Sequence, residues 1–258
     1  MKILFIGDTV GKAGCAIVHQ HLKHLQESLQ ADLTIVNYEN AAGGYGVTPK
    51  LADEFFDWGI DVLTSGNHIW DKKEIVPYLG KNSRLLRPAN YPQDSPGRGV
   101  AIVKTNSGEE AAVINLQGRV FMPIIDDPFR AADAQLSRLP KHIKVIFVDM
   151  HGETTSEKVA MGWYLDGRVS AVVGTHTHIP TADETILPGG TAFITDVGMA
   201  GPFFSVIGVV KEAAIKRFLT SMPGKFESAS QDARLNAVLV DVDSVTGKAR
   251  SIERIQRR

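Results

Sequence analysis

Short apolar runs that end at polar residues recur along the chain and predict the strands of an α/β fold. The runs cover residues 2–6, 33–38, 61–65, 144–150 and 170–174. Each is rich in branched or aromatic residues and is bounded by glycine or polar residues, as buried strands are. After the first run, Val18, Leu22, Leu25 and Leu29 recur with helical spacing. The alternation of strands and helices predicts parallel pairing within a sheet.

The middle of the chain has a different pattern, which predicts the start of a second sheet. Runs 100–103 and 111–116 indicate two antiparallel strands joined by a turn at Asn106, Ser107 and Gly108. Further strands are predicted over 192–195, 236–242 and 249–255, and helices over 126–139, 154–166 and 211–220. Neither a repeat nor a linker interrupts the pattern, so a single domain over 1–258 with two sheets is expected.

Polar residues and prolines mark where three helices begin or end. Thr48 is expected to cap a helix whose first residue is Pro49, and Asp71 is expected to cap the helix that follows the third strand. Gly167 is expected to end the helix over 154–166. These positions place the loop residues discussed below between strand ends and helix starts.

The amino-acid composition is that of an ordinary globular protein, and its charge balance disfavours duplex nucleic acid as a partner. The 258 residues are 43% hydrophobic and 22% charged, and 28 Lys and Arg stand against 29 Asp and Glu. The net charge of -1 gives no basic surplus for binding duplex nucleic acid. Cys15 is the only cysteine, so no intramolecular disulfide can form. Without a signal-peptide pattern or a long apolar run, a cytoplasmic protein that does not bind membranes is expected.

Metal-ligating residue types follow five of the predicted strands. They are Asp8, Glu39, Asn40, Asn67, His68, His151, His176 and His178. Carboxyl ends of parallel strands lie along one edge of a sheet, where open α/β sheets bind their ligands. His176 and His178 are two residues apart, so in extended backbone both imidazoles point the same way. The pair alone is also compatible with a half-exposed strand, but five strand ends of this kind indicate a site.

The set is too large for one metal ion and predicts two. Two divalent ions and the carboxylates of Asp8 and Glu39 would leave a charge of about +2, which suits an anionic phosphate. Nitrogen and oxygen ligands without thiolate disfavour a structural zinc site. Iron or manganese, divalent or trivalent, is therefore predicted, with zinc and magnesium as alternatives.

A glycine-rich loop follows Glu39 and Asn40 and is the predicted substrate-binding segment. Gly43 and Gly44 would let the backbone approach a ligand closely. Tyr45 could stack on a nucleobase. The alternative is a simple turn in which Tyr45 only packs against the loop.

The order of these motifs resembles the calcineurin-like metallophosphoesterases. The matching blocks are Gly7-Asp8, Gly66-Asn67-His68, His151-Gly152 and Gly174-Thr175-His176-Thr177-His178. Val10 stands where these enzymes have a histidine, and Glu39-Asn40 replaces their usual Gly-Asp block. Both departures are similar to the bacterial YmdB-like branch. The resemblance covers nearly the whole chain. It implies a four-layer α-β-β-α sandwich, in which helices flank two mixed sheets.

The resemblance also implies a role for each residue. Glu39 would bridge the metals, Asp8, Asn40 and His178 would bind the first metal, and Asn67, His151 and His176 would bind the second. His68 would be the general acid, because imidazole donates protons well near neutrality. The implied reaction is in-line attack of a metal-bridging hydroxide on a small phosphodiester. The expected substrates are 2′,3′-cyclic nucleotides, with 3′,5′-cyclic AMP and RNA ends as further substrates.

Two other functions are compatible with the same ligands. A regulatory module that binds metal or nucleotide could keep them without turnover, although it would not need the acid His68. A phosphomonoesterase or 5′-nucleotidase could use the same metals, although the sequence shows no arginine pair beside the ligands to hold a dianionic phosphate. The expected partners are a small phosphodiester and further copies of the chain in a homo-oligomer, not duplex nucleic acid.

Overall fold

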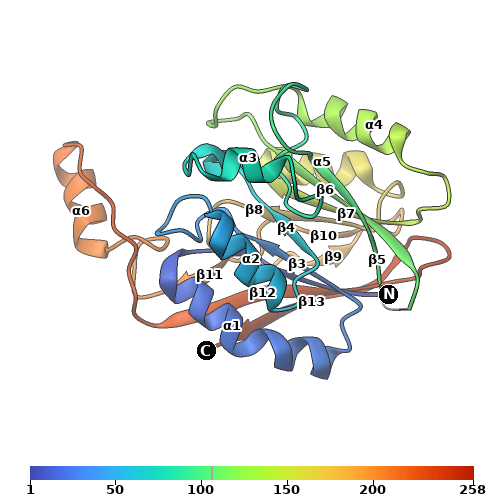
Figure 1. Cartoon of the computed structure of the whole chain (residues 1–258), viewed down its shortest axis with the longest axis horizontal. Coiled ribbons are helices and arrows are strands. Elements are labelled where there is room, and N and C mark those ends of the chain that lie inside the picture. The colour runs from blue at the N-terminus through green and yellow to red at the C-terminus, as the bar shows by residue number, and fades with distance from the viewer. Residues whose placement is uncertain (106) are drawn as a thin grey trace.

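The strands form two stacked sheets with helices on their outer faces (Figure 1). The structure is a computed structural model that describes residues 1–105 and 107–258. The predicted turn position Asn106 lies outside the described residues. The four layers and the mixed sheets confirm the predicted fold class.

The first sheet contains the N-terminal strands and both C-terminal strands. Its order is β2 (Asp8–Thr9), β11 (Met199–Pro202), β12 (Ala233–Val242), β1 (Lys2–Ile6), β3 (Leu33–Asn37) and β4 (Val62–Thr64), with β13 (Ala249–Arg257) also paired to β12. Strands β1, β3 and β4 are parallel, and β12 is antiparallel to β1. The chain therefore returns from its C-terminal third to pair with its first strand.

The second sheet is built from the middle of the chain. Its order is β5 (Val100–Lys104), β6 (Glu110–Gln117), β7 (Val145–His151), β8 (Ala171–Thr175), β10 (Ala192–Ile194) and β9 (Thr185–Ile186). The four inner strands are parallel, and the edge strands β5 and β9 are antiparallel to their neighbours. The predicted antiparallel pair is thus confirmed, and it forms one edge of the second sheet.

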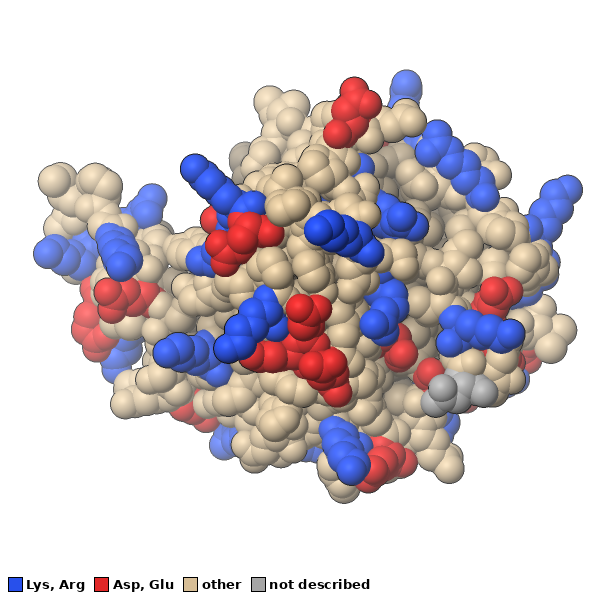
Figure 2. Space-filling model, in the orientation of Figure 1, with Lys and Arg blue, Asp and Glu red and all other residues tan. Residues whose placement is uncertain are grey.

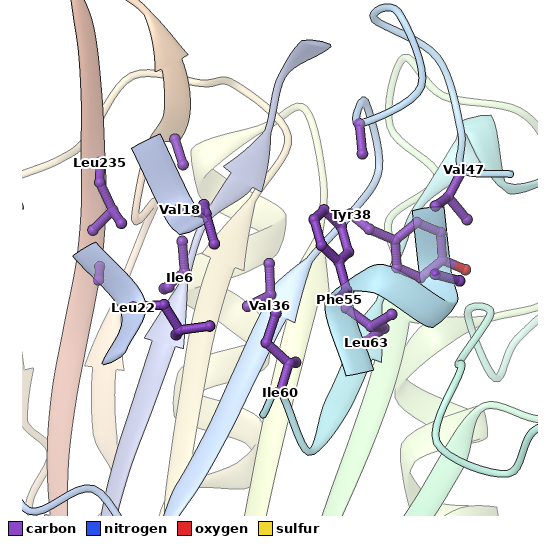
Figure 3. Packing of buried hydrophobic residues seen from close by; sticks show 14 of the residues in the cluster. Ile6, Val18, Leu22, Val36, Tyr38, Val47, Phe55, Ile60, Leu63 and Leu235 are labelled. Carbon is purple, nitrogen blue, oxygen red and sulfur yellow. The ribbon is translucent and has the colours of Figure 1, made fainter. Parts of the chain in front are cut away.

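Strand periodicity divides the apolar residues between two faces of the first sheet. Ile3 and Phe5 point to the second sheet, where the Phe5 and Phe147 rings lie 5.3 Å apart. Leu4 and Ile6 point to the opposite face. There α1 (Gly11–Leu29) and α2 (Pro49–Asp57) cover the sheet, and Val18, Leu22 and Phe55 pack on Ile6, Val36 and Leu63 (Figure 3). A side-chain period of two therefore fills both cores from one strand.

The remaining helices have different roles. Helices α4 (Pro128–Arg138) and α5 (Thr155–Leu165) cover the second sheet, while α3 (Ile75–Leu79) is short. Helix α6 (Lys211–Thr220) projects from the body, at the left of Figure 1. Among the described residues, no helix is both long and apolar enough to cross a bilayer. Both signs of charge are interspersed on the face shown in Figure 2, which offers no broad basic surface for a duplex.

Helix ends agree with the predictions at two positions and disagree at one. Thr48 caps α2, where its hydroxyl accepts a hydrogen bond from the Leu51 amide at 3.2 Å. Gly167, in left-handed conformation, follows the last residues of α5. The prediction for Asp71 is wrong. A 3₁₀ helix spans Asn67–Trp70, and the Asp71 side chain contacts the His68 ring instead of capping a helix.

Candidate metal centre

The predicted ligands come together where strand ends of both sheets meet. Asp8 follows β1, while Glu39 and Asn40 follow β3 in the same sheet. His151 ends β7 and His176 follows β8, both in the second sheet. Asp8, Glu39 and His151 are fully buried. The centre therefore lies between the two sheets and not at the edge of one.

A cavity of about 380 Å³ opens above these buried side chains. Glu39, Asn40, His68, His176 and His178 reach it from below. The other lining residues are Val10, Gly44, Tyr45, Glu153, Thr177, Ile207, Gly208, Val209, Phe226, Glu227 and Ser228. Its size fits the reactive end of a nucleotide, with the rest of the molecule at the mouth.

Two hydrogen-bond acceptors face each other at the first predicted metal position. His178 Nδ1 lies 2.7 Å from the Ile207 carbonyl oxygen, which can only accept, so Nδ1 carries the proton. Burial lowers the pKa of His178, which keeps the ring neutral. Its unprotonated Nε2 lies 3.1 Å from Oδ1 of Asn40, whose Nδ2 donates to Gly44. Two lone pairs at this distance repel unless a cation lies near both.

The same arrangement recurs at the second predicted metal position. Thr175 Oγ1 donates to Asp149 at 2.8 Å, so it accepts the Nδ1 proton of His151 at 2.9 Å. His176 Nε2 donates to the Glu153 carboxylate at 2.9 Å. Burial lowers the pKa of both rings, that of His176 to about 4. His151 Nε2 and His176 Nδ1 are therefore two unprotonated nitrogens only 3.0 Å apart.

The two carboxylates sit in surroundings that disfavour their charge. Burial raises the pKa of Asp8 to about 7, to which the nearby Asp196 contributes, and raises that of Glu39 well above its usual range. Glu39 Oε1 accepts from the His68 amide at 2.6 Å and lies 3.5 Å from His151 Nε2. Oδ1 of Asp8 and Oδ1 of Asn67 are buried without a hydrogen-bond partner in the described structure. Bound cations would stabilise both carboxylates and supply the missing partners.

These side chains fit a pair of metal ions. Two facing acceptor pairs, two unpaired acceptor oxygens and a carboxylate between them match the nitrogen and oxygen donors of a dinuclear site. In the part of the chain that the structure describes, no three His, Cys, Asp or Glu side chains converge on one point. Instead the donors contact one another and the backbone. Second-layer bonds from Thr175 and Ile207 fix the ring orientations, as is usual for metal-binding histidines.

The histidine loop and its glycine neighbour are shaped for close packing. His176 and His178 have φ of 103° and 67°, a region that non-glycine residues rarely adopt. Such backbone costs about 1–3 kcal/mol per residue and is typical of functional sites. Gly66 is required because a Cβ there would lie 2.0 Å from the His151 ring. The glycine of the Gly66-Asn67-His68 block thus leaves space for His151, a predicted ligand of the second metal.

His68 lies at the mouth of the centre, where it can reach a substrate. Its Nδ1 lies 2.7 Å from Oδ2 of Asp71, so Nδ1 carries a proton that the carboxylate accepts. A second proton on Nε2 makes the ring cationic, and this Nε2 proton is the one that can be donated. The Tyr45 ring meets the imidazole edge-on, with centroids 5.0 Å apart. Asp71 and Tyr45 therefore fix the orientation of His68. The partner role of Asp71 was not predicted, because the same residue type suits a helix cap.

A buried ion pair supports the histidine loop from behind. Lys158 Nζ lies 2.7 Å from Oδ2 of Asp196, and both side chains are fully buried. The same carboxylate accepts from the amide and the hydroxyl of Thr177, at 3.1 and 2.8 Å. Thr177 lies between His176 and His178, the two histidines predicted to bind metal. The pair therefore holds the loop that presents them.

Lys158→Met is expected to lower the free energy of unfolding by about 3–5 kcal/mol, because it leaves the Asp196 charge buried and unpaired. Urea unfolding followed by circular dichroism measures the change. Lys23→Met, on the exposed surface of α1, is the control and should change little. A loss below about 1 kcal/mol for Lys158→Met would show that the pair does not support the loop.

Val10, which is predicted to stand where calcineurin-like enzymes have a histidine, is tightly packed. It is 3% exposed, and a Cβ added at Gly201 or Gly208 would lie within 3.0 Å of it. Val10 and Asn40 form an isolated β-bridge, so Asn40 lies directly beside this position. The replacement of the missing histidine by Asn40 stays a prediction, which the test below addresses.

Val10→His is expected to destabilise the protein by about 1–3 kcal/mol through overpacking and to add no metal affinity. Thermal unfolding and metal analysis measure both effects. Val10→Ile, which is also larger but cannot bind metal, separates packing from coordination. Tighter metal binding with unchanged activity would show that Asn40 is not a ligand.

The predicted loop is only partly in the cavity, and the opposite wall was not predicted. Gly44 and Tyr45 line the cavity, whereas Gly43 is exposed and is not part of the lining. Ile207 and Phe226 form the opposite wall, from the segments that flank α6. Glu153 was also missed, although it comes two residues after the predicted ligand His151. No local motif marks the 207–228 segment, because only the fold brings it to the site.

Comparisons with known proteins agree with this geometry. Residues 4–255 match the family model for YmdB-like proteins. The chain is 51% identical over 255 residues to the 2′,3′-cyclic-nucleotide 2′-phosphodiesterase of Bacillus subtilis, covering 99% of this chain and 96% of that protein. A solved protein of Thermus thermophilus has a TM-score of 0.94 at 40% identity, with 100% and 99% of the chains covered. A novel phosphatase of Mycoplasma pneumoniae has a TM-score of 0.93 at 36% identity, with 100% and 93% covered.

Proposed function

The chain belongs to the family of YmdB-like proteins, and on this basis we propose that it hydrolyses 2′,3′-cyclic nucleotides at a dinuclear metal centre. It is a hydrolase of phosphoester bonds, as its phosphodiesterase and phosphatase relatives are. The observation that carries the proposal is the two pairs of facing acceptors beneath the cavity, His178 with Asn40 and His151 with His176. These pairs lie directly below the place where a phosphate can enter.

Different residues of the centre would have different roles in the hydrolysis of a diester. Bound cations would neutralise phosphate charge and lower the pKa of a water. Asp8, Glu39, Asn40, Asn67, His151, His176 and His178 would hold them. His68 would donate its Nε2 proton to the departing alkoxide, while Asp71 keeps the ring oriented. The apolar wall of Ile207 and Phe226 would limit access of bulk water.

The lining favours a diester over a monoester. No lysine or arginine is among the cavity-lining residues of the described chain. Glu153 and Glu227 add negative charge at the mouth, which opposes a dianionic monoester more than a monoanionic diester. The cyclic diester is also compact enough to enter while its base remains outside. The phosphodiesters of 3′,5′-cyclic AMP and of RNA ends are also monoanionic, so the same argument admits them as substrates.

The types of donor atom at the proposed centre indicate which metal it would bind. Imidazole nitrogen with carboxylate and amide oxygen suits iron and manganese, with zinc and magnesium as alternatives. Cys15 is half-buried in α1 and is not among the lining residues, so no thiolate takes part. We therefore propose iron or manganese as the native pair.

The main alternative to an enzyme is a regulatory protein that binds metal or nucleotide without turnover. The orientation of His68 by Asp71 favours an enzyme, because a binder needs no leaving-group acid. The deciding experiment measures turnover of 2′,3′-cyclic AMP, bis(nitrophenyl) phosphate and 5′-AMP by the metal-loaded protein. Hydrolysis of both diesters with little release of phosphate from 5′-AMP is expected. Absence of diester turnover would support the regulatory module, and preferential turnover of 5′-AMP would support a nucleotidase.

Tyr45→Ala is expected to raise the Michaelis constant for 2′,3′-cyclic AMP by about 5–100-fold, the size of one base-stacking contact. Tyr45→Phe, which keeps the ring, should stay near wild type. A loss confined to kcat would instead show that Tyr45 serves only to orient His68.

The salt dependence of the same constant tests the size of the substrate. The log–log slope of binding against salt should be shallow, because the metal pair engages one phosphate. A slope steeper than about -3 would indicate several phosphate contacts and a larger nucleic acid.

We also propose that the protein is cytoplasmic and forms a homo-oligomer that covers α6. Phe218 and Leu219 are 82% and 81% exposed, and a helix of ten residues is marginal without packing. Light scattering of Phe218→Asp beside wild type measures the assembly. Equal masses would show that α6 is not the contact.

A further inference from the structure

A second cleft, apart from the metal centre, is lined by arginines. It has a volume of about 830 Å³ and lies between α4 and the loop over residues 87–100. Arg87, Arg98, Arg130 and Arg138 line it, with Asp126 and Asp127 as the acidic residues of the lining. Four arginines against two aspartates leave a net charge of +2. None of its lining residues is shared with the metal-centre cavity.

Helix α4 supplies one wall of the cleft. Arg130, Ala134 and Arg138 are spaced i, i+4 and i+8, so they lie along one face of the helix. At 1.5 Å per residue the two arginine positions are about 12 Å apart along the axis. Ala131 and Ala134 between them are small, which leaves the cleft floor open. Blue side chains predominate around α4, at the upper right of Figure 2.

The loop that forms the other wall is held rigidly by a buried arginine. Arg87 is 5% exposed, and its guanidinium donates to the carbonyls of Pro88, Ser95 and Pro96 at 2.8, 3.2 and 3.1 Å. No carboxylate within the described residues pairs with it. Arg98 is exposed on the same loop between Gly97 and Gly99. One of the four positive charges of the cleft is therefore fixed in this wall.

The cleft arginines lack intramolecular anions. Across residues 1–105 and 107–258, the side chains of Arg98, Arg130 and Arg138 take part in no hydrogen bond or ion pair, unlike the paired Arg119. Asp127 is occupied, since it caps α4 and binds Arg119 at 2.7 Å. Among the lining residues of the cleft, Asp126 is then the carboxylate left to oppose them. Guanidinium groups recognise phosphate with paired hydrogen bonds.

We propose that this cleft binds a small ligand with at least two linked phosphate groups, such as a nucleoside triphosphate or an inorganic polyphosphate. Arg130 and Arg138 line the cleft from α4 and Arg98 lines it from the facing loop, so a ligand with several linked phosphates can contact all three guanidinium groups together. The volume suits a nucleotide-sized molecule. The inference is independent of the proposed diesterase activity, because it uses other residues and another surface.

The test is calorimetric binding of inorganic triphosphate and of ATP to the metal-loaded protein. The variant Arg98→Gln/Arg130→Gln/Arg138→Gln should bind at least about 100-fold more weakly than wild type, roughly tenfold per arginine contact. It should keep its hydrolysis of 2′,3′-cyclic AMP. Arg254→Gln/Arg257→Gln/Arg258→Gln changes the net charge equally on β13 and at the C-terminus, and should bind as wild type does.

The outcomes separate the two sites and the two ligand sources. Any triphosphate bound at the metal centre is lost in Glu39→Gln and kept in the cleft variant. Binding of both ligands that depends on the cleft arginines supports recognition of the phosphate chain, and binding of ATP alone supports a nucleotide site. Equal affinity of wild type, cleft variant and control variant would overturn the proposal, even if diester hydrolysis is confirmed. Single Arg130→Gln and Arg138→Gln variants repeat the test should the triple variant be unstable.

Discussion

Glu39→Gln is expected to lose metal from both positions and to reduce hydrolysis of 2′,3′-cyclic AMP by about 10³-fold or more. The carboxylate lies between the two groups of donors. It contacts the amides of Gly66 and His68 and lies 3.5 Å from His151 Nε2. An amide would remove one charge and one donor from two cations together. Loss of several kcal/mol of charge stabilisation corresponds to a rate loss of this size.

Elemental analysis and steady-state kinetics measure the two effects on the same preparation. Glu27→Gln, on the exposed surface of α1, is the matched control and should keep both metals and activity. Circular dichroism shows whether the Glu39 variant is folded. A folded Glu39→Gln protein that retains two metals per chain would contradict the bridging role.

His68→Ala is expected to keep both metals and to slow hydrolysis of 2′,3′-cyclic AMP by roughly 10²–10⁴-fold, the usual effect of losing a general acid. His68 is at the cavity mouth, and its ring contacts Asp71 and Tyr45 instead of the buried donors. A nitrophenyl leaving group needs little protonation. The loss on bis(nitrophenyl) phosphate should therefore be much smaller.

The ratio between the two substrates is the measured quantity. His142→Ala, an exposed histidine near β6, should leave both rates unchanged. Asp71→Asn should lower the rate on the cyclic nucleotide in the same direction as His68→Ala but by less, because the ring remains. Equal losses on both substrates in His68→Ala would show that this residue does not protonate the leaving group.

Much of the fold and the ligand set could be predicted because both depend on local pattern. A strand such as β1 must alternate its side chains between two cores, so all its residues from Ile3 to Ile6 are apolar. Its end is then marked by Gly7 and Asp8. The same logic located Glu39, His151 and His176, and the structure brings these residues together.

Other features depend on contacts between distant segments and have no local signal. The division of five strand ends between two sheets follows from pairing that spans the chain, as when β12 returns to β1. The wall formed by Ile207 and Phe226 likewise reaches Asn40 only in the folded state. Asp71 was misassigned because an aspartate before a helix serves equally as a cap or as a histidine partner.

The arginine cleft also could not be predicted from local sequence patterns. Arg130 and Arg138 read as ordinary surface residues of a helix, and Arg98 lies in a proline-rich loop. Only the packing of that loop against α4 places their guanidinium groups around one hollow. Their spacing on the helix can be read from the sequence. That their side chains have no acidic partner in the described residues can be seen only in the folded structure.

Titration of metal-stripped protein with Mn²⁺, with 2′,3′-cyclic AMP turnover followed at each addition, tests the dinuclear diesterase centre most directly. The two facing acceptor pairs predict that activity is absent without metal and rises until two equivalents per chain are bound. Glu27→Gln, which removes an exposed carboxylate on α1, should give the same curve. Full turnover by metal-free protein, or saturation at one equivalent, would contradict the assignment of His178 with Asn40 and His151 with His176 to two metal ions.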